Sequence, residues 1–176
     1  VHKNSQQPSG CASRDIGITA GRIVAVEPQL MAAATETLDA RGKLVVPGLL
    51  DIHSHAARDA KGPALCLQDG VTGWIDAGSA GAEQIDAAVA IAKAAPQQCR
   101  LLINIGRSGI LPEGDTMDLA RADVTAARDA IARHRDYVVG IKARLSETVV
   151  GKNDVEVLRR AQEAAAPFGL PVMIHM

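Results

Sequence analysis

Two histidines separated by one residue, His53 and His55, follow the apolar segment 44–50 and are the first side chains whose spacing suggests chemistry. Side chains at positions i and i+2 of a β-strand lie on one face, so both imidazoles are expected to project together with Asp51. Two neutral imidazoles side by side suit a divalent metal such as Zn2+. The pattern alone is more typical of exposed or capping histidines. Its position at the end of an apolar strand is what favours a metal site.

Lys142 and His175 stand at matching positions, at the ends of the apolar segments 137–141 and 171–174. A buried lysine is costly unless it is paired or neutral. Lys142 therefore either lies past its strand and reaches water along its stem, or has a lowered pKa that lets it act as a base or be modified. A lone histidine such as His175 is more often a core residue than a ligand. Three of five expected strands nevertheless deliver a nitrogen side chain to one end, which favours a metal site.

The elements that position these residues alternate between strand and helix. The expected strands are 44–53, 72–77, 100–105, 137–142 and 171–175, with apolar residues at helical spacing between most of them. This order predicts a parallel sheet with right-handed crossovers. It fits an open doubly wound sheet or a (β/α)8 barrel, which needs about 250 residues. The last helix is expected to begin with a capping box of Asn153 and Glu156.

The N-terminal part of the sequence follows a different pattern. Residues 1–14 are polar and turn-rich and are expected to form an irregular leader. Residues 15–43 predict a small antiparallel sheet: a hairpin turning at Ala20 and Gly21, and a second strand pair around 40–42. Such a sheet is too small to be stable alone. Residues 44–176 then form the main domain.

Composition excludes several functions. The 176 residues are 47% hydrophobic and carry 19 basic against 20 acidic side chains, scattered along the chain, so no footprint for a nucleic acid or an anionic membrane is expected. No apolar run approaches the roughly 18 residues of a membrane span. The three cysteines are not in CxxC pairs and fit reduced thiols in a cytoplasmic protein. A small-molecule substrate is the expected partner.

Four segments carry a resemblance to a known family. PGLLDIHSH at 47–55 resembles the first-strand signature of the amidohydrolase superfamily. The segments GVTGWIDAGSAGAEQID, VVGIKARLS and LPVMIHM are similar to its dihydroorotase-like amidohydrolase/deacetylase branch. The resemblance implies an incomplete (β/α)8 TIM-type barrel of about four and a half units, with part of a small N-terminal β-sandwich to which the hairpin would belong. Members hold two divalent metals, usually zinc.

The same resemblance assigns roles to the four nitrogen side chains. His53 and His55 would bind the more buried metal, Lys142 would be carbamylated by CO2 and bridge both metals, and His175 would bind the second metal. A hydroxide between the metals would be the nucleophile. A sixth-strand histidine and an eighth-strand aspartate, the general base, have no counterpart before Met176. No catalytic acid or base is therefore assigned in this chain, and residues 1–176 alone are expected to be inactive.

Two further residues are candidates for substrate binding. Arg144 shares a strand face with Lys142 and could hold a substrate carboxylate, although a surface ion pair explains it equally well. Ser79 could touch substrate, but a turn or helix cap is the commoner role of serine among glycines. The segment 106–115 is long for a βα loop and is either part of a pocket wall or an irregular connection.

The function expected from these observations is that of a cytoplasmic, binuclear metal-dependent hydrolase acting on an amide or ester, of the deacetylase type. A cyclic-amide hydrolase similar to dihydroorotase is the alternative within the family. A barrel relative that has lost catalysis and serves in binding or assembly is the alternative outside enzymes. The resemblance also makes a homo-oligomer plausible, and no residue of the sequence specifies its interface.

Overall fold

The computed structural model describes residues 12–176, which belong to two units, Val1–Pro47 and Gly48–Met176. Most of the predicted leader, including Cys11, lies outside the described residues. In the first unit, β1 (Asp15–Thr19) and β2 (Arg22–Glu27) pair antiparallel around Ala20 and Gly21, whose φ angles of 49° and 72° close a tight hairpin turn. The predicted hairpin is therefore confirmed, whereas the surrounding β-sandwich stays a prediction.

The second strand pair, predicted around residues 40–42, is wrong. These residues form a turn in which the Lys43 amide donates to the Ala40 carbonyl at 3.0 Å. Leu38 and Leu44 lie on either side of this turn, and both are exposed. Without an apolar face to bury, the flanking residues gain too little from pairing to form a strand.

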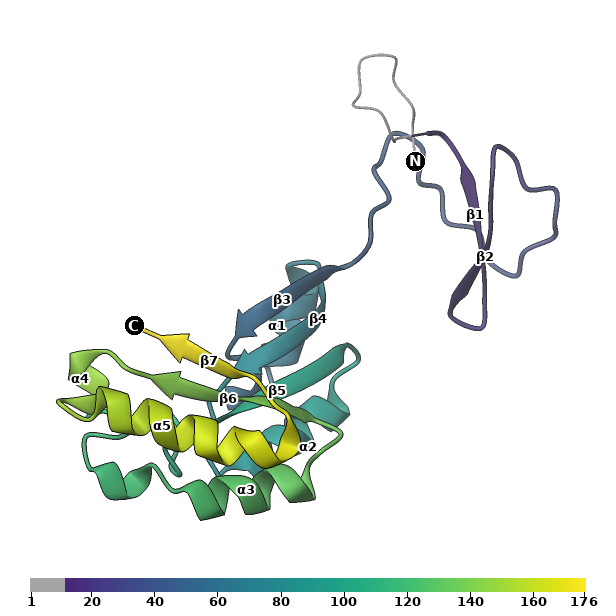
Figure 1. Cartoon of the computed structure of the whole chain (residues 1–176). Coiled ribbons are helices and arrows are strands. Elements are labelled where there is room, and N and C mark those ends of the chain that lie inside the picture. Colours follow the sequence, from purple (N-terminus) through teal and green to yellow (C-terminus); the bar gives the residue numbers. More distant parts are fainter. Residues whose placement is uncertain (1–11) are drawn as a thin grey trace. The chain divides into compact units, whose positions relative to one another are not determined.

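The second unit contains a parallel sheet of five strands, and all five predicted strands are confirmed. They are β3 (Leu49–Ser54), β4 (Val71–Ala77), β5 (Gln98–Asn104), β6 (Val138–Arg144) and β7 (Val172–His175). Their order in the sheet is their order in the chain, and every neighbouring pair is parallel. The sheet curls into a half-barrel (Figure 1). The arrangement is that of a partial TIM-type barrel rather than an open sheet wound in two directions.

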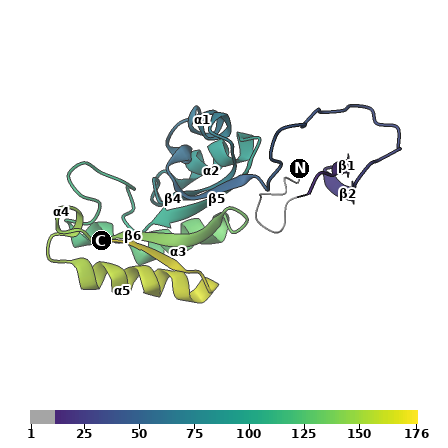
Figure 2. The same ribbon diagram turned by 90° about the horizontal axis from the view of Figure 1, so that it is seen from above.

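Helices fill the connections between the strands. They are η1 (Ala56–Arg58), α1 (Gly62–Gln68), α2 (Ile85–Ala94), η2 (Leu119–Arg121), α3 (Val124–Arg133), α4 (Glu147–Val150), α5 (Asp154–Ala165) and η3 (Ala166–Phe168). Helices α3 and α5 pack side by side against β5 and β6 (Figures 1 and 2). The core between helices and sheet is built mainly from alanine, valine and isoleucine, with the fully buried Trp74 as its largest member. None of the helices in the described part of the chain has the length and apolarity needed to span a lipid bilayer.

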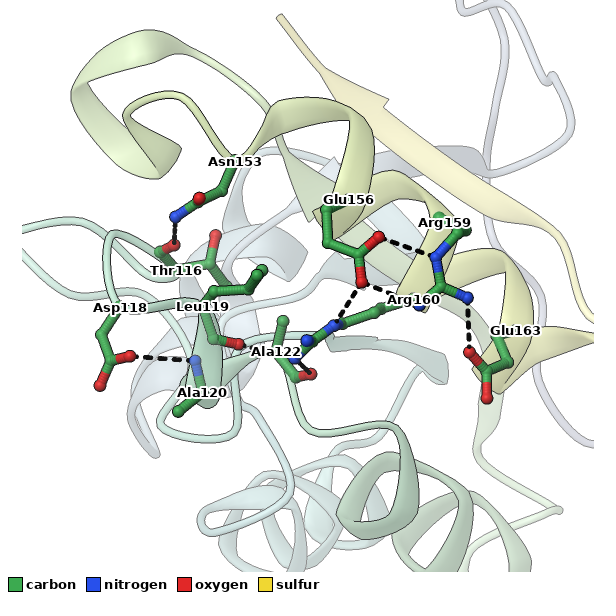
Figure 3. Close-up of polar contacts among 10 residues, drawn as sticks. All are labelled: Thr116, Asp118, Leu119, Ala120, Ala122, Asn153, Glu156, Arg159, Arg160 and Glu163. Atoms are coloured by element: carbon green, nitrogen blue, oxygen red, sulfur yellow. Dashed lines mark hydrogen bonds and ion pairs between the residues drawn. The ribbon is translucent and has the colours of Figure 1, made fainter.

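The start of α5 differs from the sequence prediction. Asn153 is the N-cap residue, but with φ −94° and ψ 5° it lacks the extended backbone that lets a cap side chain reach the first turn. Its Nδ2 instead donates to the carbonyls of Thr116 and Met117 at 3.3 and 3.0 Å. Glu156 turns to Arg159 and Arg160 (Figure 3). The predicted capping box is therefore wrong. The Asn153 side chain binds backbone carbonyls before η2 and the Glu156 side chain binds two arginines, so neither caps the first turn of α5.

The two edges of the half-barrel expose apolar side chains. On β3, Leu49, Leu50 and Ile52 are each more than half exposed, Leu50 at 63%, and Ile174 on β7 is 44% exposed. Parallel sheets are normally covered on both faces. The exposed side chains are consistent with a sheet that represents part of a larger barrel.

Candidate metal centre

The carboxyl ends of the five strands meet at one edge of the sheet, because all the strands run in the same direction. This edge is where active sites of α/β barrels lie. His55 follows β3, Asp76 and Ser79 stand at and just after the end of β4, and Lys142 and His175 come from the last residues of β6 and β7. The predicted site residues thus share one rim.

The two histidines of the HxH pair lie next to each other at this rim. Their ring centroids are 5.9 Å apart, with the planes at 71°. The strand β3 ends at Ser54, and His55 is the N-cap residue of η1 with φ −127° and ψ 36°. Asp51 accepts a hydrogen bond from the His53 amide at 2.8 Å, and its carboxylate forms no metal-binding group with the two imidazoles. The predicted pair of imidazoles is present, but without the predicted neighbouring carboxylate.

Lys142 lies inside β6 and is 1% exposed. Its Nζ has no hydrogen-bond partner anywhere in the part of the chain that the structure describes. Burial lowers the pKa of Lys142, and the positive charge of Arg144 lowers it further. Of the two alternatives that the sequence left open, the structure selects the buried one: the stem does not carry the amine to water, and burial lowers its pKa.

Asp76 and Ser79 form a polar connection from the end of β4 to His55. Asp76 is 1% exposed and accepts hydrogen bonds from the Ser79 amide at 2.7 Å, the Ser79 hydroxyl at 2.9 Å and the Ala57 amide at 3.0 Å. Ser79 Oγ also lies 2.8 Å from Nδ1 of His55. Although His55 is exposed at the rim, the protein around its ring lowers its pKa by displacing water, and Asp76 opposes this shift. A neutral imidazole is the form that binds metals.

Arg144 is held by a buried carboxylate. Its Nη1 lies 3.1 Å from Oδ1 of Asp115, which is itself 2% exposed. The other oxygen of Asp115 accepts from Asn104 Nδ2 at 3.0 Å, and the Leu111 amide donates to Oδ1 at 3.0 Å. Residues 106–115 contain no helix or strand, and Asp115 anchors them to Arg144. Substrate binding by Arg144 stays a prediction, and the ion pair predicted as its alternative is present.

His175 is the last residue of β7 and is exposed, with its backbone paired in register with Arg144. Across residues 12–176, no group of three or more His, Cys, Asp or Glu side chains is close enough to hold a metal ion. His175 is thus not brought into one cluster with His53 and His55. The set of four metal ligands therefore stays a prediction.

Sequence reasoning missed three buried polar residues around the rim: Asp76, Asn104 and Asp115. Asn104 pairs in register with Lys142 and donates to the Gly78 carbonyl at 3.2 Å. The signal that could have found Asp76 is a charged residue in the otherwise apolar strand sequence VTGWIDA. Its spacing of three from Ser79 is that of a side chain capping a turn.

Sequence comparison relates the chain to several hydrolases. It is 32% identical over 181 residues to a deacetylase from Enterococcus faecalis, an alignment spanning 99% of this chain and 49% of that protein. It is 31% identical over 187 residues to an allantoinase from Rubrobacter xylanophilus, spanning 94% of this chain and 37% of that protein. No family model matches the chain. The chain spans about half the length of the curated deacetylases it matches.

Structure comparison gives the same group of proteins. The crystal structure of an adenine deaminase matches 93% of this chain and 46% of that chain, with a TM-score of 0.75 and 29% identity. A dihydroorotase structure matches 95% of this chain and 47% of that chain, with a TM-score of 0.80; its 23% identity shows the fold alone. Together with the strand-end site, these likenesses define the class: the chain belongs to the amidohydrolase superfamily.

Proposed function

We propose that the protein is a metal-dependent hydrolase that cleaves an amide or ester bond in a small acylated molecule, as a deacetylase does. The observation that carries the proposal is the buried amine of Lys142 at the same rim as the His53 and His55 pair. A buried lysine with a lowered pKa in a site of convergent polar groups is a functional candidate rather than a structural one. The deacetylase from Enterococcus faecalis supports the choice of acyl group removal.

The residues at the rim fit a site for two divalent metals, with Zn2+ as the expected ion. His53 and His55 offer neighbouring neutral imidazoles, the nitrogen ligands that zinc prefers. Lys142 would supply oxygen atoms after carbamylation, and His175 would supply a nitrogen to the second metal. The four proposed ligands come from the carboxyl ends of three strands, β3, β6 and β7, or from the residue directly after β3.

Carbamylation of Lys142 follows from its burial. The neutral amine attacks the carbon of CO2, a new N–C bond forms, one C=O π bond becomes a C–O⁻ bond, and the nitrogen releases a proton. Burial favours the neutral amine that this reaction needs. The product carries an anionic group with two oxygen atoms in place of the neutral amine, and such a group would suit divalent cations as a ligand. A lysine that stayed charged here would lack compensation.

When bound, the metals would polarise the scissile carbonyl and lower the pKa of the attacking water. The chain's own residues supply the frame for that chemistry. The turn after β4 holds His55 through Ser79, and Asp115 of segment 106–115 holds Arg144. Arg144 and Ser79 remain candidates for contacts to substrate, and no general base is proposed among residues 1–176.

A cyclic-amide hydrolase is the second candidate. The allantoinase from Rubrobacter xylanophilus and the dihydroorotase from Solibacter usitatus favour it, because both names describe ring-opening enzymes. Acyl and cyclic-amide substrates place the same kind of carbonyl at the metals, so the rim residues alone are compatible with either. We also propose a cytoplasmic location, since Cys66 and Cys99 are free thiols among the described residues.

The test compares the intact protein with two lysine variants. The wild type is expected to bind about two zinc ions per chain, to require bicarbonate for full reconstitution, and to hydrolyse N-acyl or O-acyl compounds faster than cyclic amides. Lys142→Met is expected to lose the bridging ligand, most of the zinc and all activity, while its free energy of unfolding stays unchanged or rises, because methionine fills a similar volume without a buried amine. Lys152→Met, at an exposed position, is the control.

Three results would overturn parts of this proposal. A wild type with no zinc at stoichiometric levels and no hydrolysis would favour a barrel relative that serves in binding or assembly. Full activity of Lys142→Met would remove the lysine from the site. Faster turnover of cyclic amides than of acyl compounds would select the second candidate.

A further inference from the structure

The hydrogen bonds around Ser79 determine where its proton lies. Both carboxylate oxygens of Asp76 accept: Oδ1 from the Ser79 amide, and Oδ2 from the Ser79 hydroxyl and the Ala57 amide, at 2.7, 2.9 and 3.0 Å. A carboxylate with this set of donors is an acceptor only. The single hydroxyl proton of Ser79 is therefore directed to Asp76.

The position of that proton fixes the tautomer of His55. Ser79 Oγ and His55 Nδ1 are 2.8 Å apart, and a hydrogen bond of that length needs one proton between the two atoms. Because the serine proton is already on the Asp76 side, Nδ1 of His55 carries the proton and donates to Oγ. In a neutral imidazole the other nitrogen, Nε2, then holds the lone pair.

We propose that Asp76 and Ser79 are positioning residues that hold His55 in its Nδ1–H tautomer, so that Nε2 is the atom presented to a metal. This inference rests on the proposed function. Histidine ligands in metalloproteins characteristically donate their second ring N–H to a neighbouring acceptor, which orients the ring and raises its basicity. The hydroxyl of Ser79 is the intermediate link, and the carboxylate of Asp76 is the terminal acceptor.

The surroundings make this connection a rigid one. Asp76 is 1% exposed and belongs to β4. In the pairing of β4 with β3, Asp76 lies opposite Ser54. Its bond to the Ala57 amide ties the turn carrying His55 directly to the same carboxylate. The loop after β4 is packed so closely that a Cβ on Gly78 would overlap the Lys142 stem. Ser79 thus has little freedom to rotate away from His55.

The tautomer is measured directly, and without metal. In the intact, metal-free protein labelled with 15N-histidine, long-range 1H–15N correlations distinguish an Nδ1–H ring from an Nε2–H ring, and the His55 signals are assigned by their absence in His55→Gln. The wild type is expected to show the Nδ1–H form. Ser79→Ala is expected to return His55 to a mixture of both forms, and Ser79→Thr, which keeps the hydroxyl, to retain the wild-type pattern. An Nε2–H ring in the wild type would overturn the inference.

Zinc affinity supplies the second readout. By competition with a chelator, Ser79→Ala is expected to bind zinc about 10- to 100-fold more weakly than the wild type, the usual loss when such a partner is removed. Ser79→Thr is expected to bind within a few-fold of the wild type. Ser108→Ala is the matched control, because the Ser108 hydroxyl donates to Glu83 at 2.8 Å in an exposed part of the rim loop. Unchanged zinc affinity and an unchanged tautomer in Ser79→Ala would contradict the inference.

The two readouts separate this inference from the proposed function. A wild type that binds no zinc but shows the Nδ1–H ring, lost in Ser79→Ala, would reject the metal centre while keeping the hydrogen-bond connection. A wild type that binds zinc with an Nε2–H ring would keep the metal centre and reject the connection.

Discussion

Gly78 and Lys142 illustrate how a single missing side chain makes room for the site. Gly78 has a φ of 81°, and a Cβ placed on it would overlap Lys142 Cβ and lie 2.7 Å from Lys142 Cγ. Gly70 has nearly the same φ, 80°, but a Cβ placed on it would meet no other atom within 4 Å. A side chain at Gly70 would therefore meet backbone strain alone, whereas one at Gly78 would meet both backbone strain and a clash with Lys142.

Alanine at these two positions is expected to have different effects. Gly70→Ala bears only the strain of a left-handed backbone, about 1–2 kcal/mol. Gly78→Ala adds an overpacked contact worth about 1–3 kcal/mol more, and displaces the stem of Lys142. Urea unfolding of both variants checks the difference in free energy. Equal losses of unfolding free energy in the two variants would show that the Lys142 stem moves aside at no cost.

At the same scale, the sequence predicts some site residues and not others. His53, His55, Lys142 and His175 are identifiable because each is a nitrogen side chain at the end of an apolar run. The role of Asp76 depends on β4 lying beside β3, which brings Asp76 into register with Ser54 next to His55. The partner of Arg144 depends on how residues 106–115 fold back. The local Asp76–Ser79 turn could have been predicted from spacing, but the bond of Asp76 to the Ala57 amide and the Arg144–Asp115 pair join segments far apart in the chain and could not.

At the scale of elements, α5 is attached to the loop before α3 by one arginine. Arg160 Nη1 donates to the carbonyls of Leu119 and Ala122 at 2.8 and 3.1 Å (Figure 3). Arg159 binds the same Glu156 and also Glu163, but stays on the helix surface, with its side chain 58% exposed. The two neighbouring arginines share a partner and differ in whether they reach the loop.

We expect Arg160→Met to destabilise the protein by about 1–2 kcal/mol, because two backbone carbonyls lose a charged donor. Arg159→Met is expected to cost less than about 1 kcal/mol, as exposed ion pairs usually do. The comparison is made by chemical denaturation at one pH and ionic strength. An equal or larger loss for Arg159→Met would contradict the anchoring role of Arg160.

Glu156 makes the stability of α5 depend on pH. Hydrogen bonds from Arg159 and Arg160 lower its pKa from the ordinary 4.5 to about 2. Between these values the unfolded chain binds more protons than the folded one, so stability rises with pH. The contribution of Glu156 is complete above about pH 4.5 and is lost as the pH falls through about 2.

Glu156→Gln is expected to be less stable than the wild type at pH 6, with a difference that shrinks as the pH falls toward 2. Thermal unfolding across this range measures it. Glu113→Gln, at an exposed loop position, is the control and is expected to follow the wild type. A stability difference for Glu156→Gln that stays constant with pH would show that the ion pairs do not contribute.

Some of the strands and helix ends can be predicted from the sequence better than others. The strands are predicted well because short apolar runs between helical patterns have few alternatives in a parallel sheet. The capping box of α5 fails because Asn153 and Glu156 find partners in the segment before η2 and in the next turn, which local sequence does not specify. The prediction of a strand pair around residues 40–42 fails because the apolar residues that flank the turn, Leu38 and Leu44, are exposed and gain nothing from pairing.

At the scale of the whole molecule, the half-barrel exposes apolar side chains at its edges, and no general base is proposed among residues 1–176. A protein made only of residues 1–176 is therefore expected to show no turnover of acyl substrates, even with zinc and bicarbonate. The Enterococcus faecalis deacetylase, assayed alongside, controls for the conditions. Zinc-dependent hydrolysis by residues 1–176 would contradict this expectation.

The order of the sheet also bears on how the protein is made. Because β3, β4, β5, β6 and β7 are neighbours in the order in which they are synthesised, each strand leaves the ribosome beside a partner that already exists. At about 5–20 residues per second, every new strand has seconds to dock before the next one emerges. We therefore expect the histidine pair and Asp76 to come together first, Lys142 to join them next, and His175 to come last.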